Sequence, residues 1–264
     1  MLTISHLFIY PIKSLGGTVV KTAKLTDRGF EYDRRWMLVD TDNRFLTQRE
    51  FPKMALLQAA IMADRLTITH KLSGDNLSIP LEAEKGKTIS CEIWHDSCQL
   101  QLVSDEADNW FSKMLETNCR LVFMPDTESR IVDTNYAGNG ELTSLSDGFP
   151  LLMIGQASLD DLNSRMEIAL PMDRFRPNIV FTGGIPYEED DMKHFQINDI
   201  HFYCVKPCAR CPIPTIDQNN ATTSKEPLKT LAGYRMRNNN VYFGQNIIFH
   251  GEGTISVGSN IKFP

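Results

Sequence analysis

The sequence predicts an α+β protein rich in β-strands, with an N-terminal β-barrel-like part and a second barrel-like part that carries flanking helices. Short segments of β-branched and aromatic residues recur through the first part, with turn residues between them. Helical periodicity appears later and in few places. We therefore predict two domains, residues 1–120 and 121–264, with a boundary between 118 and 145.

The predicted strands begin with TISHLFIY, which ends at Pro11. Three hairpins follow, with turns expected at residues 41–43, 63–64 and 95–97: RRWMLVD with RFLTQ, ALLQAAIM with RLTITH, and ISCEIW with CQLQLV. Later strands are predicted at NIVF, IHFYCV, QNIIFH and TISV. The close spacing of the early strands is typical of a small barrel or sandwich.

Three segments are predicted to be helices. Residues 105–116 place Ala107, Trp110, Phe111, Met114 and Leu115 on one apolar stripe, with Ser104 as the N-cap. A second helix is expected to begin near Ser158, where Ser158 and Asp161 resemble a capping box. A third is expected over residues 227–234, with Pro227 in its first turn.

Composition excludes several classes of protein. The chain has 264 residues, a net charge of −6 and a pI near 5.5, which disfavours a nucleic-acid-binding protein. No apolar run approaches the roughly 20 residues of a membrane helix, and the first residues lack the features of a signal peptide. Six cysteines are too few for a disulfide scaffold, so we expect a cytoplasmic protein without membrane partners.

Three of the cysteines, Cys204, Cys208 and Cys211, fall in one phrase, HFYCVKPCARCPIPTIDQ. Their spacing matches radical iron–sulfur enzymes, although only a short stretch of chain follows. A zinc site with His201 is a second interpretation, weakened because His201 and Cys204 should point to opposite faces of a strand. A single thiolate in a positive pocket beside Lys206 and Arg210 is a third. Buried thiols that only fill space are the fourth, and the phrase alone leaves all four open.

Several separated motifs resemble a known family. CARCPIPTID, SKEPLKTLAGYR and FGQN resemble the MOSC domain, the C-terminal domain of molybdenum cofactor sulfurase. YPIKSL and DRRWMLVD resemble the β-barrel domain that precedes it. ASLDDLNSRM and RFRPNIVFTGG are especially similar to the mitochondrial amidoxime reducing component and its bacterial relatives. The resemblance extends over essentially the whole chain.

This resemblance implies a molybdenum cofactor whose metal is bound by Cys211, the catalytic and metal-binding residue. It places Lys13, Ser14, Arg34, Arg176, Asn178 and Arg210 at cofactor-binding positions. The chemistry agrees, because thiolate is a soft ligand suited to molybdenum and because arginine forks bind phosphate. Neighbouring Arg35 is expected to be an ordinary paired cation.

The resemblance also implies a function. We expect reduction of small N-hydroxylated compounds, such as amidoximes and N-hydroxylated bases, with electrons from a separate iron–sulfur or haem protein, since no ferredoxin-like cysteine spacing follows. The alternative is a carrier of the cofactor or of sulfur without turnover, and a third possibility is a cofactor-free barrel. No general acid is evident; Asp217 is a candidate to support the cysteine loop, with turn capping the more ordinary role.

Some positions depart from the reductase pattern. Gly148 and Phe149 stand where relatives carry Thr and Ser, Ala209 replaces a common Ser, and Asn246 replaces a Tyr. Each change removes a side-chain hydroxyl near the expected cofactor. We expect these positions to affect the range of substrates rather than the metal ligand.

Overall fold

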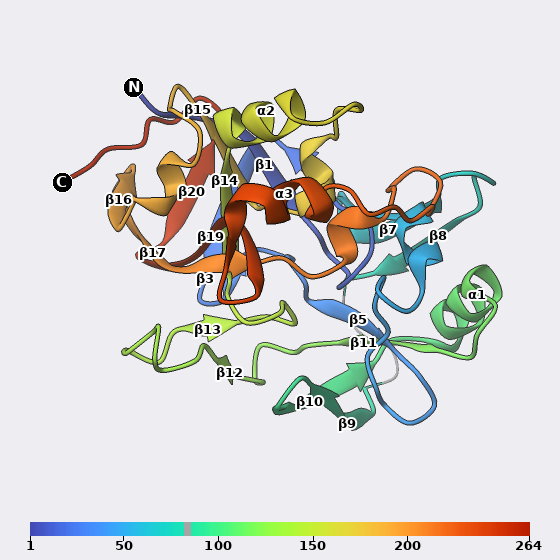
Figure 1. The fold of residues 1–264 in the computed structure, drawn as a ribbon. Coiled ribbons are helices and arrows are strands. Elements are labelled where there is room, and N and C mark those ends of the chain that lie inside the picture. The colour runs from blue at the N-terminus through green and yellow to red at the C-terminus, as the bar shows by residue number, and fades with distance from the viewer. Residues whose placement is uncertain (82–85) are drawn as a thin grey trace.

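The computed structural model describes residues 1–81 and 86–264 and confirms the β-rich α+β class. In Figure 1 the longest strands lie at the upper left with helices α2 (Gln156–Ser164) and α3 (Leu228–Arg235). Shorter sheets and helix α1 (Asp105–Leu115) lie toward the lower right. The two termini lie on the same side of the molecule.

The largest sheet among the described residues joins strands from both ends of the chain. Its order is β16 (His194–Ile197), β17 (Ile200–Ala209), β19 (Asn240–His250), β14 (Leu151–Gly155), β15 (Ile179–Thr182), β1 (Thr3–Ile9) and β2 (Thr18–Val20), with β18 (Met236–Arg237) beside β19. Strands β14 and β15 are parallel, and the other pairs are antiparallel. Because β1 pairs with β15, the N-terminal strand completes a sheet of the second half.

Smaller sheets form the rest of the fold. One contains β5 (Trp36–Val39), β11 (Arg120–Phe123), β10 (Asp96–Leu102) and β9 (Thr88–Ile93); another contains β6 (Leu57–Met62), β7 (Arg65–His70) and β8 (Asn76–Pro80). A third joins β20 (Gly253–Ser256), β3 (Thr22–Thr26) and β4 (Gly29–Phe30), and β12 (Arg130–Ile131) pairs with β13 (Leu142–Thr143). The predicted domain boundary at residue 120 stays a prediction. Two strands before it pair with strands after it, β1 with β15 and β3 with β20.

The predicted hairpins differ in outcome. The turn at 63–64 is confirmed, because Met62 pairs with Arg65. The turn predicted at 95–97 lies one residue earlier, since Ile93 pairs with Asp96. The strand predicted after β5 is wrong, because that segment forms isolated bridges instead, from Phe45 to Val39 and from Arg44 to Glu92. At its end the buried Gln48 side chain donates to the Ser14 carbonyl at 2.6 Å.

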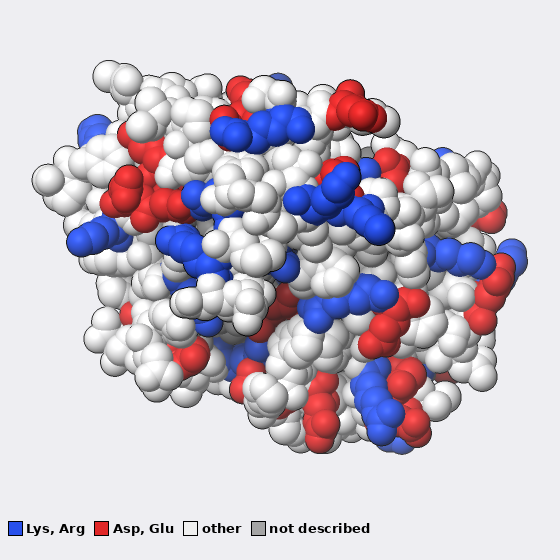
Figure 2. Space-filling view, in the orientation of Figure 1, with Lys and Arg blue, Asp and Glu red and all other residues white. Residues whose placement is uncertain are grey.

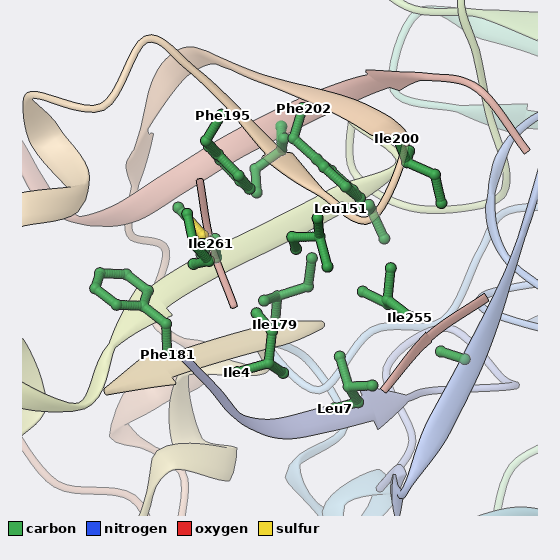
Figure 3. Packing of buried hydrophobic residues seen from close by; sticks show 14 of the residues in the cluster. Ile4, Leu7, Leu151, Ile179, Phe181, Phe195, Ile200, Phe202, Ile255 and Ile261 are labelled. Carbon is green, nitrogen blue, oxygen red and sulfur yellow. The ribbon is translucent and has the colours of Figure 1, made fainter. Parts of the chain in front are cut away.

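The core of the main sheet is aromatic and aliphatic. Phe181, Phe195 and Phe202 are fully buried and converge with isoleucines and leucines from several strands (Figure 3). The rings of Phe195 and Phe202 stack at 5.3 Å across β16 and β17. Burial of each such side chain contributes about 1.5–3 kcal/mol to folding. This packing fixes the strand ends that form the candidate site.

Helix α1 forms as the sequence predicts. Ala107, Phe111 and Leu115 are buried, and the Ser104 hydroxyl accepts a hydrogen bond from the Ala107 amide at 3.1 Å. We expect Ser104→Ala to lower the free energy of unfolding by about 1 kcal/mol, because one helix-end amide loses its partner. Urea unfolding measures this, with Ser104→Thr as the control that keeps the hydroxyl. Equal loss in both variants would contradict a capping role.

The capping box predicted at Ser158 is wrong. Helix α2 begins at Gln156 with Gly155 as its N-cap, so Ser158 lies inside the first turn. Its buried hydroxyl instead donates to the Glu189 carboxylate at 2.8 Å and accepts from the Tyr187 amide. A tertiary contact has therefore replaced the local cap. Helix α3 lies within one residue of its predicted bounds.

Candidate functional site

A pocket of about 150 Å³ lies where five segments of the fold meet. These are the residues after β1 and β4, the loop before β14, the turn before β15 and the end of β17. The pocket wall contains all seven residues predicted from the sequence: Lys13, Ser14, Arg34, Arg176, Asn178, Arg210 and Cys211. Figure 2 shows Lys and Arg side chains gathered over the middle of the face that it draws.

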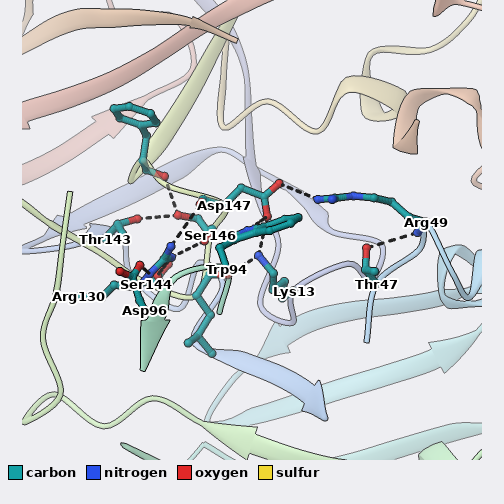
Figure 4. Close-up of polar contacts among 12 residues, drawn as sticks. Lys13, Thr47, Arg49, Trp94, Asp96, Arg130, Thr143, Ser144, Ser146 and Asp147 are labelled. Atoms are coloured by element: carbon teal, nitrogen blue, oxygen red, sulfur yellow. Dashed lines mark hydrogen bonds and ion pairs between the residues drawn. The ribbon is translucent and has the colours of Figure 1, made fainter. Parts of the chain in front are cut away.

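Lys13 forms an ion pair in the wall of the pocket, in which its own side chain is buried and that of Asp147 is more than half exposed. Its ammonium donates to the Asp147 carboxylate at 2.7 Å and to the Leu145 carbonyl at 2.8 Å (Figure 4). Burial lowers the pKa of Lys13, while Asp147 opposes that shift. Desolvation would raise the pKa of Asp147, but the charges of Lys13 and Arg49 outweigh it and hold that pKa well below its usual range. Asp147 is therefore an anion at neutral pH and a poor proton donor.

Arg34 is held by groups from two distant segments. Its guanidinium contacts the buried Asp33 carboxylate at 2.5 Å and donates to the Asn178 side-chain oxygen at 3.0 Å. The Asn178 oxygen also accepts from the Leu152 amide, and its amide nitrogen donates to the Phe8 carbonyl. Asn178 thus joins β1, β14 and Arg34, so it orients Arg34 as well as facing the pocket.

Arg176 forms no ion pair with a carboxylate among the residues that the structure describes. It donates to the Leu15 carbonyl at 2.6 Å and is nine-tenths buried. Burial and the nearby positive charge of Arg34 lower the pKa of Arg176 to about 10. A buried guanidinium that lacks a carboxylate partner favours the binding of an anion.

At the end of β17, Arg210 contacts Cys208, the first cysteine of the CARC phrase. The Arg210 guanidinium contacts the Cys208 sulfur at 3.2 Å and donates to the Phe175 carbonyl at 2.7 Å. Burial raises the pKa of Cys208, and the Arg210 charge partly opposes that shift. Cys211 lines the same pocket two residues beyond the strand. An arginine thus lies beside Cys208 as expected, but the raised pKa favours the neutral thiol there over the expected thiolate; Cys208 and Cys211 both line the pocket.

Three of the predicted residues have a backbone conformation that is uncommon without glycine. Ser14, Arg34 and Arg176 have φ values of 67°, 50° and 56°. Such a conformation costs free energy and persists where surrounding contacts enforce it, often at functional sites. Here the enforcement comes from bonds such as that between the Arg34 amide and the Tyr10 carbonyl, at 2.8 Å.

The positions that depart from the reductase pattern also line the pocket: Gly148, Phe149, Ala209 and Asn246. A Cβ added at Gly148 would meet no atom within 4 Å, so this position leaves open space. Phe149 packs edge-on against Tyr136, and the Lys206 ammonium lies 4.3 Å from the Tyr136 ring. These residues shape one side of the pocket.

Other predicted residues lie elsewhere. Arg35 points away from the pocket and binds the Met124 carbonyl and the exposed Asp126 carboxylate. Asp217 accepts from the amides of residues 219 and 220, which is the predicted turn-capping role, and also from Arg174. Since Arg174 in turn donates to the Pro214 carbonyl, Asp217 supports the loop after Cys211.

His201 does not join the cysteines. Its ring contacts His194 at 2.9 Å and the Gln196 amide. Within residues 1–81 and 86–264, no group of three or more His, Cys, Asp or Glu side chains is arranged to hold a metal ion. The zinc site that the cysteine phrase left open is thus not formed by the described residues.

Sequence reasoning missed Tyr10 and Asp33. Both are buried beside predicted site residues, and the Tyr10 amide donates to the Asp33 carboxylate at 2.8 Å. The only signal was their position, directly before PIKS and directly before Arg34. A buried acid next to two arginines cannot be distinguished from a surface acid by sequence pattern alone.

The donor groups of the pocket fit an anionic cofactor that carries a phosphate and a metal. Lys13, Arg34, Arg176 and Arg210 supply four cations, against the carboxylates of Asp33 and Asp147. The Nε of Arg210 is buried without a hydrogen-bond partner in the described part of the chain, so one donor is free. The thiol of Cys211 adds a soft metal ligand beside these cations.

None of the helices formed by the described residues has the length and apolar character needed to cross a bilayer.

Comparisons with known proteins extend these observations. The model of the MOSC N-terminal beta barrel domain matches residues 1–118, and that of the MOSC domain matches residues 141–262. Mitochondrial amidoxime-reducing component 1 of Mus musculus is 31% identical over 98% of this chain and 81% of its own length. Mitochondrial amidoxime reducing component 2 of Bos taurus is 33% identical over 89% of this chain and 72% of its own length.

The second group of relatives is much longer. Molybdenum cofactor sulfurase of Oryza sativa subsp. japonica is 31% identical over 91% of this chain, which spans 32% of that protein. Relatives of both groups match between 89% and 98% of this chain. The chain therefore belongs to the family of MOSC-domain proteins that carry an N-terminal MOSC β-barrel domain.

Proposed function

We propose that this protein binds a molybdenum cofactor in the pocket and reduces small N-hydroxylated compounds with it. The comparisons confirm the predicted cofactor class, since the relatives include molybdenum cofactor sulfurases and amidoxime-reducing components. An oxidoreductase is the coarser activity that the relatives' names support. The observation that carries the proposal is the convergence of four cations and Cys211 on one pocket.

Each residue has a proposed task. Cys211 would bind the metal, while Arg34, Arg176 and Arg210 would bind the phosphate and pterin end. Lys13 and Asp147 form an ion pair that would hold their part of the pocket wall in place. Asn178 would act mainly by holding Arg34 in place, because both ends of its amide are engaged. When bound, the cofactor would supply the two-electron redox chemistry, with the substrate oxygen leaving as water.

The electrons are proposed to come from a separate iron–sulfur or haem protein. The overall change consumes two electrons and two protons for each N–OH bond that becomes N–H. Asp147 is ionised at neutral pH and balances Lys13, so we assign it no role as a proton donor. The open space at Gly148 and the side chain of Asn246 leave the substrate side of the pocket without bulky polar groups.

The central test is reduction of benzamidoxime to benzamidine by cofactor-loaded protein. We expect turnover with an artificial reductant and a higher rate when the native iron–sulfur or haem donor is added from cell extract. Protein produced in a host that cannot make the cofactor is the matched control. Loaded protein with stoichiometric molybdenum and no turnover under either condition would contradict the reductase activity.

The sulfurase relatives support a second candidate, a carrier of the cofactor or of sulfur. The observation that favours it is the 31% identity to the rice sulfurase over most of this chain. A carrier would release its cofactor to an acceptor apoenzyme, whereas a reductase would retain it. Transfer of molybdenum from loaded protein to a cofactor-free molybdoenzyme, measured after separation of the two, distinguishes these functions.

A further inference from the structure

Tyr10 contacts two of the pocket arginines, Arg34 and Arg176, which are far apart in the sequence. The ring centroid lies 4.4 Å from the Cζ of Arg34 and 4.3 Å from the Cζ of Arg176. The Tyr10 side chain is almost completely buried. A guanidinium over an aromatic face is attracted by the ring quadrupole, and the attraction is largest where water is excluded.

The backbone of Tyr10 is fixed as firmly as its ring. Its amide donates to the Asp33 carboxylate at 2.8 Å, and its carbonyl accepts from the Arg34 amide at 2.8 Å. Gly17 lies against the ring, and a Cβ at that position would collide with the Tyr10 side chain. The absence of a side chain at Gly17 therefore makes room for this ring, and the close contacts leave the ring little freedom to move.

The hydroxyl of Tyr10 does not explain this arrangement. It is buried and has no hydrogen-bond partner among the residues that the structure describes. Burial also raises the pKa of the Tyr10 phenol, so the group is neutral and adds no charge to the pocket. The aromatic face is thus the part of Tyr10 that contacts the two guanidinium groups.

We propose that Tyr10 is a positioning residue whose ring holds Arg34 and Arg176 together, preorganised for the anionic end of the bound cofactor. This inference rests on the proposed function. It explains how two groups of like charge remain together in one buried site. Without the ring, repulsion between the guanidinium groups would spread them apart. The cations would then have to be reassembled when an anion binds, which weakens binding.

The test uses cofactor-free full-length protein and pyrophosphate as the anion. We expect Tyr10→Leu to weaken pyrophosphate binding by about ten-fold in calorimetry, while Tyr10→Phe binds within about two-fold of the wild type. Tyr10→Met, which has a similar size but no aromatic face, should behave as Tyr10→Leu does. Thermal unfolding of each variant identifies any that fail to fold.

A spectroscopic signature separates positioning from general packing. Ring currents shift the Nε–H resonances of arginines that lie over an aromatic ring, and the two signals are assigned with Arg34→Lys and Arg176→Lys. Both shifts should persist in Tyr10→Phe and disappear in Tyr10→Met. Unchanged arginine signals and unchanged pyrophosphate affinity in folded Tyr10→Met overturn the proposal, as does a wild type that binds no pyrophosphate.

Molybdenum content of wild-type protein from a cofactor-producing host is measured in parallel. Absence of molybdenum together with normal pyrophosphate binding contradicts the proposed function and still supports the role of Tyr10 toward anions. Presence of molybdenum with unaltered retention in Tyr10→Met contradicts the role of Tyr10 alone. The two hypotheses therefore fail in different measurements.

Discussion

Replacement of Cys211 by Ser is expected to abolish N-hydroxylated-compound reduction. A thiolate is a soft ligand for molybdenum, whereas the serine hydroxyl is hard and normally protonated. Activity should fall to background, and the paramagnetic resonance spectrum of the poised protein should change even where the pterin stays bound. An unaltered spectrum in Cys211→Ser would remove Cys211 as the metal ligand.

Cys208→Ser is the matched control within the same phrase. The Arg210 guanidinium donates a hydrogen bond to the Cys208 sulfur at 3.2 Å, and a serine hydroxyl can still accept that hydrogen bond. Molybdenum content and spectrum should therefore change little in this variant. A site in which both cysteines bind metal, such as zinc, predicts equal loss of metal in the two variants. Metal analysis of both proteins side by side distinguishes the two outcomes.

Removal of Arg176 is expected to lower cofactor retention by about ten- to a hundred-fold, the value of a lost charge-assisted hydrogen bond. Its guanidinium donates to the Leu15 carbonyl and pairs with no carboxylate in the described part of the chain, so Arg176→Ala breaks no ion pair. The measurement is molybdenum and released pterin per folded protein after gel filtration. Circular dichroism and thermal unfolding confirm that each compared protein is folded.

Arg34→Ala should lower retention to a similar extent and also destabilise the fold. The buried Asp33 carboxylate would lose its partner, which typically costs about 3–5 kcal/mol. Arg35→Ala is the control, because its side chain is buried to a similar degree but pairs with the exposed Asp126 outside the pocket. Similar molybdenum contents in Arg176→Ala and Arg35→Ala would show that the anion site lies elsewhere.

Local sequence signals were sufficient for most of the elements. The stripe from Ala107 to Leu115 and the cap at Ser104 depend on neighbours within one or two turns, and the structure contains both. The hairpin at 63–64 likewise depends on adjacent residues. The error at Ser158 has a tertiary cause, because its hydroxyl donates to Glu189, a partner distant in sequence. After β5 the chain forms isolated bridges, one of them to Glu92 in β9, in place of the predicted strand.

In the candidate site, too, some features follow from the sequence alone and others from the tertiary structure. The sequence by itself determined the chemistry: a thiol-rich phrase, four cations and a family resemblance that names a cofactor. Only the tertiary structure decided that Lys13 meets Asp147, that Arg34 meets Asn178, and that Tyr10 joins Arg34 to Arg176. These partners are separated by more than 100 residues along the chain, apart from Tyr10 and Arg34. Their contacts arise because β1 packs beside β15 in one buried sheet, and the free energy of that packing involves the whole core rather than any local period.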